Sequence, residues 1–261
     1  MLADLTAGAV ADARLREESQ SLSEVERLAA LRPAARDARA ALAPAGRVKI
    51  IAEVKRASPS RGDLAEIPDP AHQARRYEQG GASAISVLTE GRRFKGSLAD
   101  LEAVKASVSL PVLRKDFIAT PYQVVEARAA GADLVLLIVA ALPQPLLREL
   151  YALVQQLGMT ALVEAHTAEE VARAVDVGAQ VIGVNARDLK TFELDQDLFG
   201  RLAGSIPDEV IKVAESAVKV PADVAHYRAA GADVVLVGEA LVTGDPVATL
   251  GAFLAGAEVD A

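Results

Sequence analysis

Eight short runs rich in β-branched residues alternate with helix-length segments along this chain, and this alternation constrains the fold more than any other feature. The runs cover residues 48–54, 84–88, 112–115, 134–139, 161–164, 181–185, 210–214 and 234–237. Strands separated by helices pair in parallel through right-handed crossovers. A doubly wound open sheet also alternates in this way but usually carries fewer strands. Eight strands in 261 residues therefore predict an α/β fold of the eightfold β/α (TIM) barrel type.

An internal repeat supports the strand count. The second, fourth, sixth and eighth runs each follow a Gly-Ala pair, at residues 81–82, 131–132, 178–179 and 231–232. A glycine in the left-handed conformation commonly ends a helix before the chain turns into the next strand. The pairs recur about every 50 residues, which is the length of two β/α units.

The first 47 residues differ from the rest. They are rich in Ala, Arg and Glu, are broken at Pro33, and end at Pro44-Ala45-Gly46. Apolar residues recur at helical spacing, which predicts one or two helices lying over the main body; these residues are Leu15, Leu22, Val25, Leu28 and Leu31. We expect one domain over residues 1–261, with a helical extension at 1–47 and the barrel at 48–256.

Composition excludes several classes of function. A net charge of −8 disfavours general nucleic-acid binding, which needs a surplus of Lys and Arg. The longest apolar run, 134–142, is too short to cross a membrane, and the polar, acidic N-terminal residues do not resemble a secretory signal. There is no cysteine, and the three histidines lack metal-ligand spacing. We therefore expect a cytoplasmic protein without metal or cofactor.

Polar residues gather where the predicted strands end. In a barrel these ends form the active-site face, and residues two apart on a strand share a side. Two carboxylates, two lysines, an amide, a guanidinium and a hydroxyl should converge there, which suits acid–base chemistry on a carbonyl compound. The residues are Glu53 with Lys55, Lys115 with Phe117, Glu164, Asn185 with Arg187, and Ser216.

Other charged residues receive structural interpretations. Arg114 and Asp116 face away from Lys115 and should pair beneath the helices. Lys49 and Lys212 lie near strand starts, the face associated with stability. His166 could carry a proton, although a packing role in its loop is favoured.

Two loops predict a phosphate site. In many barrels the loops after the seventh and eighth strands bind phosphate through backbone N–H groups. Here they contain Ser216-Ala217 and Gly238-Glu239, and the glycine would let the backbone approach an anion. Residues 56–60 (RASPS), which include Ser58, add hydroxyls and a turn beside Lys55.

Several long strings resemble the indole-3-glycerol phosphate synthase family of tryptophan biosynthesis. They are IAEVKRASPS at 51–60, SVLTE at 86–90, FKGSL at 94–98, PVLRKDF at 111–117, LVE at 162–164, IGVNARDL at 182–189 and AES at 214–216. The resemblance covers essentially the whole barrel and extends to the N-terminal helical segment.

The resemblance implies closure of the pyrrole ring of 1-(o-carboxyphenylamino)-1-deoxyribulose 5-phosphate, with loss of carbon dioxide and water. Lys115 would be the general acid for the carbonyl, and we expect neighbouring cations to lower its pKa toward neutrality. Glu53 and Glu164 would move later protons, and Lys55 would contact the phosphate or carboxylate or act as an acid in dehydration. Asn185 would orient the substrate.

Substrate binding is also implied by the resemblance. Arg187 would help to hold the substrate carboxylate, and an apolar wall for the anthranilate ring is available from Pro59, Phe94, Phe117 and Leu136. Leu136 would fit an ordinary core role equally well.

The chain departs from the family at one position. The family usually has glycine after the serine at the seventh strand end, where this chain has Ala217. If that position needs a positive φ, alanine adds strain of about 1–2 kcal/mol. We then expect weaker phosphate binding with the chemistry preserved.

Two alternatives stay open at this point. Phosphoribosylanthranilate isomerase uses a similar barrel but relies on a cysteine, which this chain lacks. A non-catalytic barrel that binds a phosphorylated metabolite is the second alternative, and the intact set of acids and lysines disfavours it. The partner in each case is a phosphorylated small molecule, and a monomer and a homodimer fit equally well.

Overall fold

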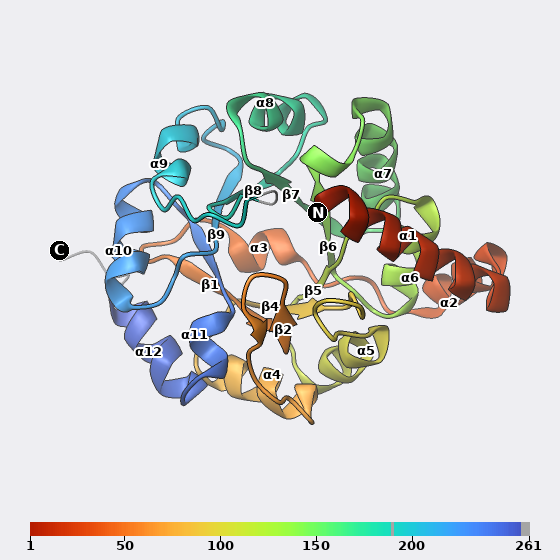
Figure 1. The fold of residues 1–261 in the computed structure, drawn as a ribbon, viewed down its shortest axis with the longest axis horizontal. Coiled ribbons are helices and arrows are strands. Elements are labelled where there is room, and N and C mark those ends of the chain that lie inside the picture. The colour runs from red at the N-terminus through yellow and green to blue at the C-terminus, as the bar shows by residue number, and fades with distance from the viewer. Residues whose placement is uncertain (189–190, 257–261) are drawn as a thin grey trace.

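The computed structural model describes residues 1–188 and 191–256; Leu189 of the IGVNARDL string and residues 257–261 lie outside this part. Its centre is a closed barrel of parallel strands in the order β1-β10-β9-β8-β7-β6-β5-β4 (Figure 1). The strands are β1 (Lys49–Val54), β4 (Ala84–Leu88), β5 (Val112–Lys115), β6 (Leu134–Ile138), β7 (Thr160–Ala165), β8 (Val181–Asn185), β9 (Ile211–Glu215) and β10 (Val234–Val237). The predicted TIM barrel is confirmed.

All eight predicted strands are present, and their bounds differ from prediction by at most one residue. The difference that matters is in β9, which begins at Ile211 and ends at Glu215 instead of Ala214. Glu215 is therefore the last residue of a strand, and its side chain lies on the same inward side as that of Val213. The predicted strand stopped one residue before it, at Ala214.

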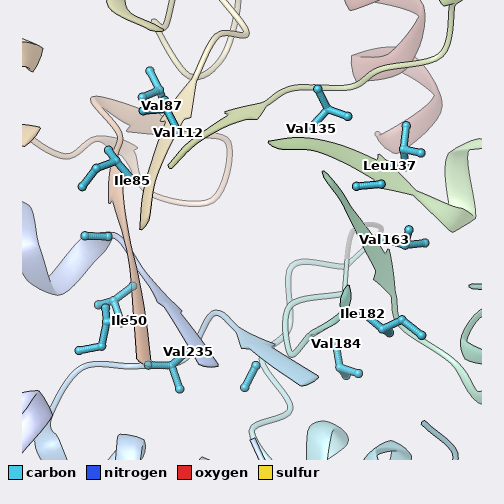
Figure 2. Packing of buried hydrophobic residues seen from close by; sticks show 14 of the residues in the cluster. Ile50, Ile85, Val87, Val112, Val135, Leu137, Val163, Ile182, Val184 and Val235 are labelled. Atoms are coloured by element: carbon cyan, nitrogen blue, oxygen red, sulfur yellow. The ribbon is translucent and has the colours of Figure 1, made fainter. Parts of the chain in front are cut away.

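A ring of helices covers the outer side of the barrel. They are α4 (Pro70–Gln79), α5 (Leu98–Ser107), α6 (Pro121–Ala129), α7 (Gln144–Gln156), α8 (Ala168–Asp176), α9 (Leu198–Ala203), α10 (Pro221–Ala229) and α12 (Pro246–Gly256). Figure 2 shows outward strand residues such as Ile50, Ile85 and Val163, which belong to the cluster shared with these helices. The glycines of the Gly-Ala repeat have φ of 79–95°, so their predicted helix-ending conformation is confirmed.

The inner side of the barrel forms a second apolar cluster. Its strand members include Ile51, Leu113, Leu162 and Leu236, all fully or nearly fully buried. Residues from α3 (Ala38–Leu42) and from α1 (Leu2–Ser19) belong to the same cluster. The apolar interior is thus continuous with two N-terminal helices.

The N-terminal segment contains three helices where one or two were expected: α1, α2 (Leu22–Leu31) and α3. The predicted apolar stripe is also partly wrong, because Leu15 is 63% and Leu31 69% exposed. Small residues such as Ala13 make the contact instead, and they allow α1 to lie close to α6. No helix in the described ranges is long and apolar enough to cross a membrane.

The α1–α2 pair covers α6, which is therefore buried on both sides, between the barrel and these helices. Arg114 on β5 points outward into this interface and is fully buried. Its guanidinium contacts Glu126 at 2.9 Å and Asp116 at 3.1 Å, while Arg16 of α1 bonds the same Glu126. The structural pairing predicted for Arg114 and Asp116 is confirmed.

The remaining elements are short. β2 (Ala57–Ser58) and β3 (Gly62–Asp63) form a small antiparallel hairpin after β1, η1 (Val139–Ala141) follows β6, and α11 (Glu239–Val242) follows β10.

Replacing Glu126 should destabilise the fold, since it would leave the buried Arg114 with one carboxylate partner. We expect Glu126→Leu to lower the free energy of unfolding by about 3 kcal/mol in urea titrations. Glu102→Gln is the matched control: it removes a surface pair with Arg32 (3.5 Å) and should change stability by less than about 0.5 kcal/mol. Equal effects of the two substitutions would contradict the role given to the buried network.

Candidate active site

A cavity opens at the carboxyl ends of the barrel strands. Every site residue predicted from the sequence lines it: Glu53, Lys55, Ser58, Pro59, Phe94, Lys115, Phe117, Leu136, Glu164, Asn185, Arg187, Ser216, Ala217, Gly238 and Glu239. These residues come from six strands and the loops that follow strands. Alternation along each strand turns their side chains inward, above the apolar interior.

Lys115 lies among three buried carboxylates. Its Nζ is 3.5 Å from Glu215 and 3.7 Å from Glu164, and Glu53 also acts on its charge. Burial alone would lower the pKa of Lys115, but these three carboxylates raise it well above its ordinary value. The expectation of a lowered pKa is therefore wrong, because carboxylates and not cations surround the ammonium group.

Glu215 is the central residue that the sequence analysis missed. Burial, reinforced by the neighbouring Glu164, raises its pKa well above the ordinary range. Neither of its carboxyl oxygens has a hydrogen-bond partner among the described residues. A buried carboxyl in this state holds its proton to higher pH and can donate it. Val213 faces inward, and residues two apart on a strand share a side. A predicted strand that ended at Glu215 would therefore have placed this carboxyl in the cavity.

A missing side chain on β8 makes room for Glu215. A Cβ built on Gly183 would lie 2.1 Å from Glu215 Oε1 and 3.2 Å from a methyl group of Leu162. No real contact is that short, so the carboxylate lies across the barrel only because residue 183 is glycine.

Glu53 and Lys55 form an ion pair of 2.7 Å on one side of the cavity. Burial alone would raise the pKa of Glu53, but Lys55 and Lys115 lower it below its ordinary value, so Glu53 is a carboxylate at neutral pH. Gly238 faces this pair: a Cβ there would lie 2.6 Å from Glu53 Oε1 and 3.1 Å from Lys55 Nζ. A side chain at residue 238 would therefore displace the ends of one or both members of this ion pair.

Asn185 connects two loops. Its Oδ1 accepts hydrogen bonds from Ser216 Oγ (2.8 Å) and from the Arg187 backbone N–H (3.0 Å). The amide nitrogen is the end left to donate toward a substrate oxygen. The Arg187 guanidinium bonds the Phe192 carbonyl at 3.1 Å, and burial lowers its pKa.

The loop after β9 has an uncommon backbone. Ser216 and Ala217 both have positive φ, 71° and 59°. Alanine pays a steric cost in this region that glycine avoids, so the condition stated for Ala217 in the sequence analysis is met. Across the cavity mouth, Arg61 of the β2–β3 hairpin pairs with Glu239 at 3.0 Å.

Apolar side chains cover one side of the cavity. The rings of Phe94 and Phe117 are 6.0 Å apart, and Leu136 lies below them in the inner cluster. Leu5 of α1 also lines the cavity. The sequence analysis missed Leu5, because nothing in its local pattern shows that α1 reaches the barrel mouth.

The described residues contain no group of three or more His, Asp or Glu side chains arranged to hold a metal ion. What the cavity offers is a charged lysine, paired acids and an apolar wall. The fold and the site together define a β/α barrel whose strand ends carry a cavity of acidic and basic side chains, the arrangement typical of enzymes of this architecture.

Comparison with known proteins gives the family. A profile of indole-3-glycerol phosphate synthase matches residues 2–250. The chain is 73% identical over 253 residues to the indole-3-glycerol phosphate synthase of Leifsonia xyli subsp. xyli, covering 97% of both chains. It is 60% identical to that of Mycolicibacterium vanbaalenii, covering 94% of this chain and 90% of the relative. The chain belongs to the indole-3-glycerol phosphate synthase family, carboxy-lyases of tryptophan biosynthesis.

Solved structures agree on the fold alone. An N-acetylmannosamine-6-phosphate 2-epimerase from Clostridium perfringens superposes with a TM-score of 0.60 at 16% identity, covering 74% of this chain and 87% of that one. A thiamine phosphate pyrophosphorylase from Pyrococcus furiosus superposes with a TM-score of 0.59 at 14% identity, covering 81% of this chain and 96% of that one.

Filling the space at residue 183 should displace Glu215. We expect Gly183→Ala to lower kcat about 100-fold, since a shift of about 1 Å in a positioned group can have that effect. Gly204→Ala is the matched control, because a Cβ there meets nothing within 4 Å. Steady-state kinetics and thermal unfolding of both variants would separate a lost position from a lost fold. Full activity in Gly183→Ala would contradict the importance of the Glu215 position.

Proposed function

We propose that this chain converts 1-(o-carboxyphenylamino)-1-deoxyribulose 5-phosphate to indole-3-glycerol phosphate, carbon dioxide and water. The observation that carries the proposal is the partly buried ammonium of Lys115, held among the buried side chains of Glu53, Glu164 and Glu215 beside an apolar wall. Family membership and 73% identity with a named synthase support the same reaction.

In this proposal Lys115 donates a proton to the ribulose carbonyl oxygen while the anthranilate ring carbon attacks the carbonyl carbon. The surrounding carboxylates support this role, because they keep the lysine in the protonated form that a proton donor needs. The ring carboxylate then leaves as carbon dioxide. Glu53 and Glu164 move the protons that accompany loss of the hydroxyl as water. Lys55 contacts the substrate and acts as an acid in that dehydration.

Binding is divided between two sides of the cavity. Asn185 orients the substrate through its amide, and Arg187 helps to hold the carboxylate. Phe94, Phe117, Pro59 and Leu136 form the wall against the aromatic ring. Because an apolar surface solvates the charged carboxylate poorly, holding the carboxylate against this wall favours its loss as neutral carbon dioxide.

The phosphate is assigned to the opposite side of the cavity. Backbone N–H groups of the loops after β9 and β10 bind it, at Ser216, Ala217, Gly238 and Glu239, with hydroxyls from Ser58 and charge from Lys55.

The proposed functional unit is a monomer or a homodimer in the cytoplasm. We also propose that residues 1–261 form one domain, since α1, the barrel interior and α3 share one apolar cluster.

Substituting Lys115 tests the reaction and the acid together. Indole-3-glycerol phosphate is followed by its fluorescence as it forms from the purified ribulose 5-phosphate substrate. We expect activity in the native chain and its loss in Lys115→Ala. Lys49→Ala, which removes a lysine at the opposite end of the barrel, should retain activity.

The outcomes separate the alternatives. Activity that survives in Lys115→Ala would keep the reaction and transfer the acid role to Lys55. A folded native chain without activity would favour the non-catalytic barrel that binds a phosphorylated metabolite.

Relieving the backbone at residue 217 tests the phosphate assignment. Ala217→Gly removes strain of about 1–2 kcal/mol at φ 59°, so KM should fall several-fold while kcat changes little. Ala230→Gly is the control, since that alanine has a negative φ of −80° and lies at the end of α10. An unchanged KM in Ala217→Gly would remove this loop from the binding site.

A further inference from the structure

His166 lies immediately behind one of the proposed catalytic carboxylates. It follows β7, two residues after Glu164, and its side chain is 11% exposed. It is not among the residues that line the cavity. His166 Nε2 is 3.6 Å from Glu164 Oε1 and has no hydrogen-bond partner among the described residues.

The other side of the imidazole ring is held by Glu170. This residue lies in the first turn of α8, and one of its oxygens, Oε2, accepts the His166 backbone N–H at 2.7 Å and lies 3.3 Å from His166 Nδ1. Glu170 therefore fixes the ring and favours a proton on Nδ1. Nε2 is then left facing Glu164, and only a protonated Nε2 can donate to that carboxylate.

The two oxygens of Glu164 thus face different basic side chains. Oε2 lies 3.7 Å from Lys115 Nζ, and Oε1 lies 3.6 Å from His166. On the cavity side, Glu215 and Glu164 are adjacent buried carboxyls that repel each other when both are ionised. A cation behind Glu164 opposes that repulsion without occupying space that the substrate needs.

We propose that His166 is a positioning residue that acts as an imidazolium between Glu164 and Glu170, and holds Glu164 as a carboxylate oriented into the cavity. The proposal rests on the proposed function, in which Glu164 transfers a proton. It assigns to His166 an electrostatic role in place of the loop packing favoured from sequence.

The charged groups around His166 agree in sign. Glu164 faces it from β7, Glu170 from α8, and Asp188 from the segment after β8. Burial alone would lower the pKa of His166, but the bond to Glu170 and these acidic charges raise it above 6.5. A raised pKa means that the imidazolium persists to higher pH than in an ordinary histidine and is lost as the pH rises through the higher value. Activity that depends on the cation should fall over that interval.

Titration of the ring gives the first test. The chain contains three histidines, so histidine-labelled NMR spectra resolve His166 once His166→Gln and His226→Gln identify their signals. We expect His166 to titrate above 6.5 in the native chain and at lower pH in Glu170→Gln. The glutamine side chain can still accept a hydrogen bond from the His166 backbone N–H and cap the first turn of α8, so this variant should keep its fold. Titration at or below 6.5, or no shift in Glu170→Gln, would overturn the proposal.

The pH profile of kcat/KM gives the second test. We expect an alkaline fall in the native chain that coincides with the His166 titration, moves to lower pH in Glu170→Gln, and is absent in His166→Gln. Below the pH at which His166 titrates, His166→Gln should lower kcat about tenfold, the size of one pKa-unit interaction, with KM nearly unchanged. His226→Gln, which removes an exposed histidine on α10, should match the native profile.

An alkaline fall that persists in His166→Gln, or does not move in Glu170→Gln, would overturn the proposal and leave His166 a packing residue. A native chain that forms no indole-3-glycerol phosphate would instead contradict the proposed function. In that case the NMR titration still decides whether His166 and its carboxylates are coupled.

Discussion

The structure depends on one partly buried ammonium group and the buried acidic side chains around it. Four different strands, β1, β5, β7 and β9, deliver Glu53, Lys115, Glu164 and Glu215 to the same small volume. Burying several carboxylates together is unfavourable, and cations must offset most of the cost. The remainder has to come from elsewhere in the fold, chiefly from the apolar cluster that fills the barrel below these groups and continues into α1 and α3.

Alternation along the strands keeps the site and the scaffold apart while linking them through the same backbone. On β5 the inward residues are Leu113 and Lys115, and the outward residues are Val112 and Arg114. Leu113 packs in the barrel interior and Lys115 lines the cavity. Arg114 instead bonds Glu126 of α6, which also bonds Arg16 of α1. Because α1 also supplies Leu5 to the cavity, the N-terminal helix is connected to the site from both sides of the barrel wall.

The sequence predicted the barrel, all eight strands and many of the residues that line the cavity, because period-two alternation and strand ends are local signals. It failed where the answer depends on distant neighbours. Glu215 was missed through a strand bound one residue short, and the pKa shift of Lys115 had the wrong sign because its neighbours come from three other strands. The exposure of Leu15 could not be foreseen either, since Ala13 makes the contact that helical spacing alone assigns to the leucines.

The closed strand order has a consequence for how the chain acquires its fold during synthesis. The barrel closes by pairing β1 with β10, and Lys49 lies opposite Val234. During synthesis β1 therefore cannot form this pairing until β10 has left the ribosome. The surfaces that α1 and α2 cover, on η1 and α6, are also made later than the helices themselves. Non-local pairing of this kind slows folding and leaves apolar surface uncovered on incomplete chains. Premature termination before β10 would therefore yield a fragment with an open sheet edge and a strong tendency to aggregate.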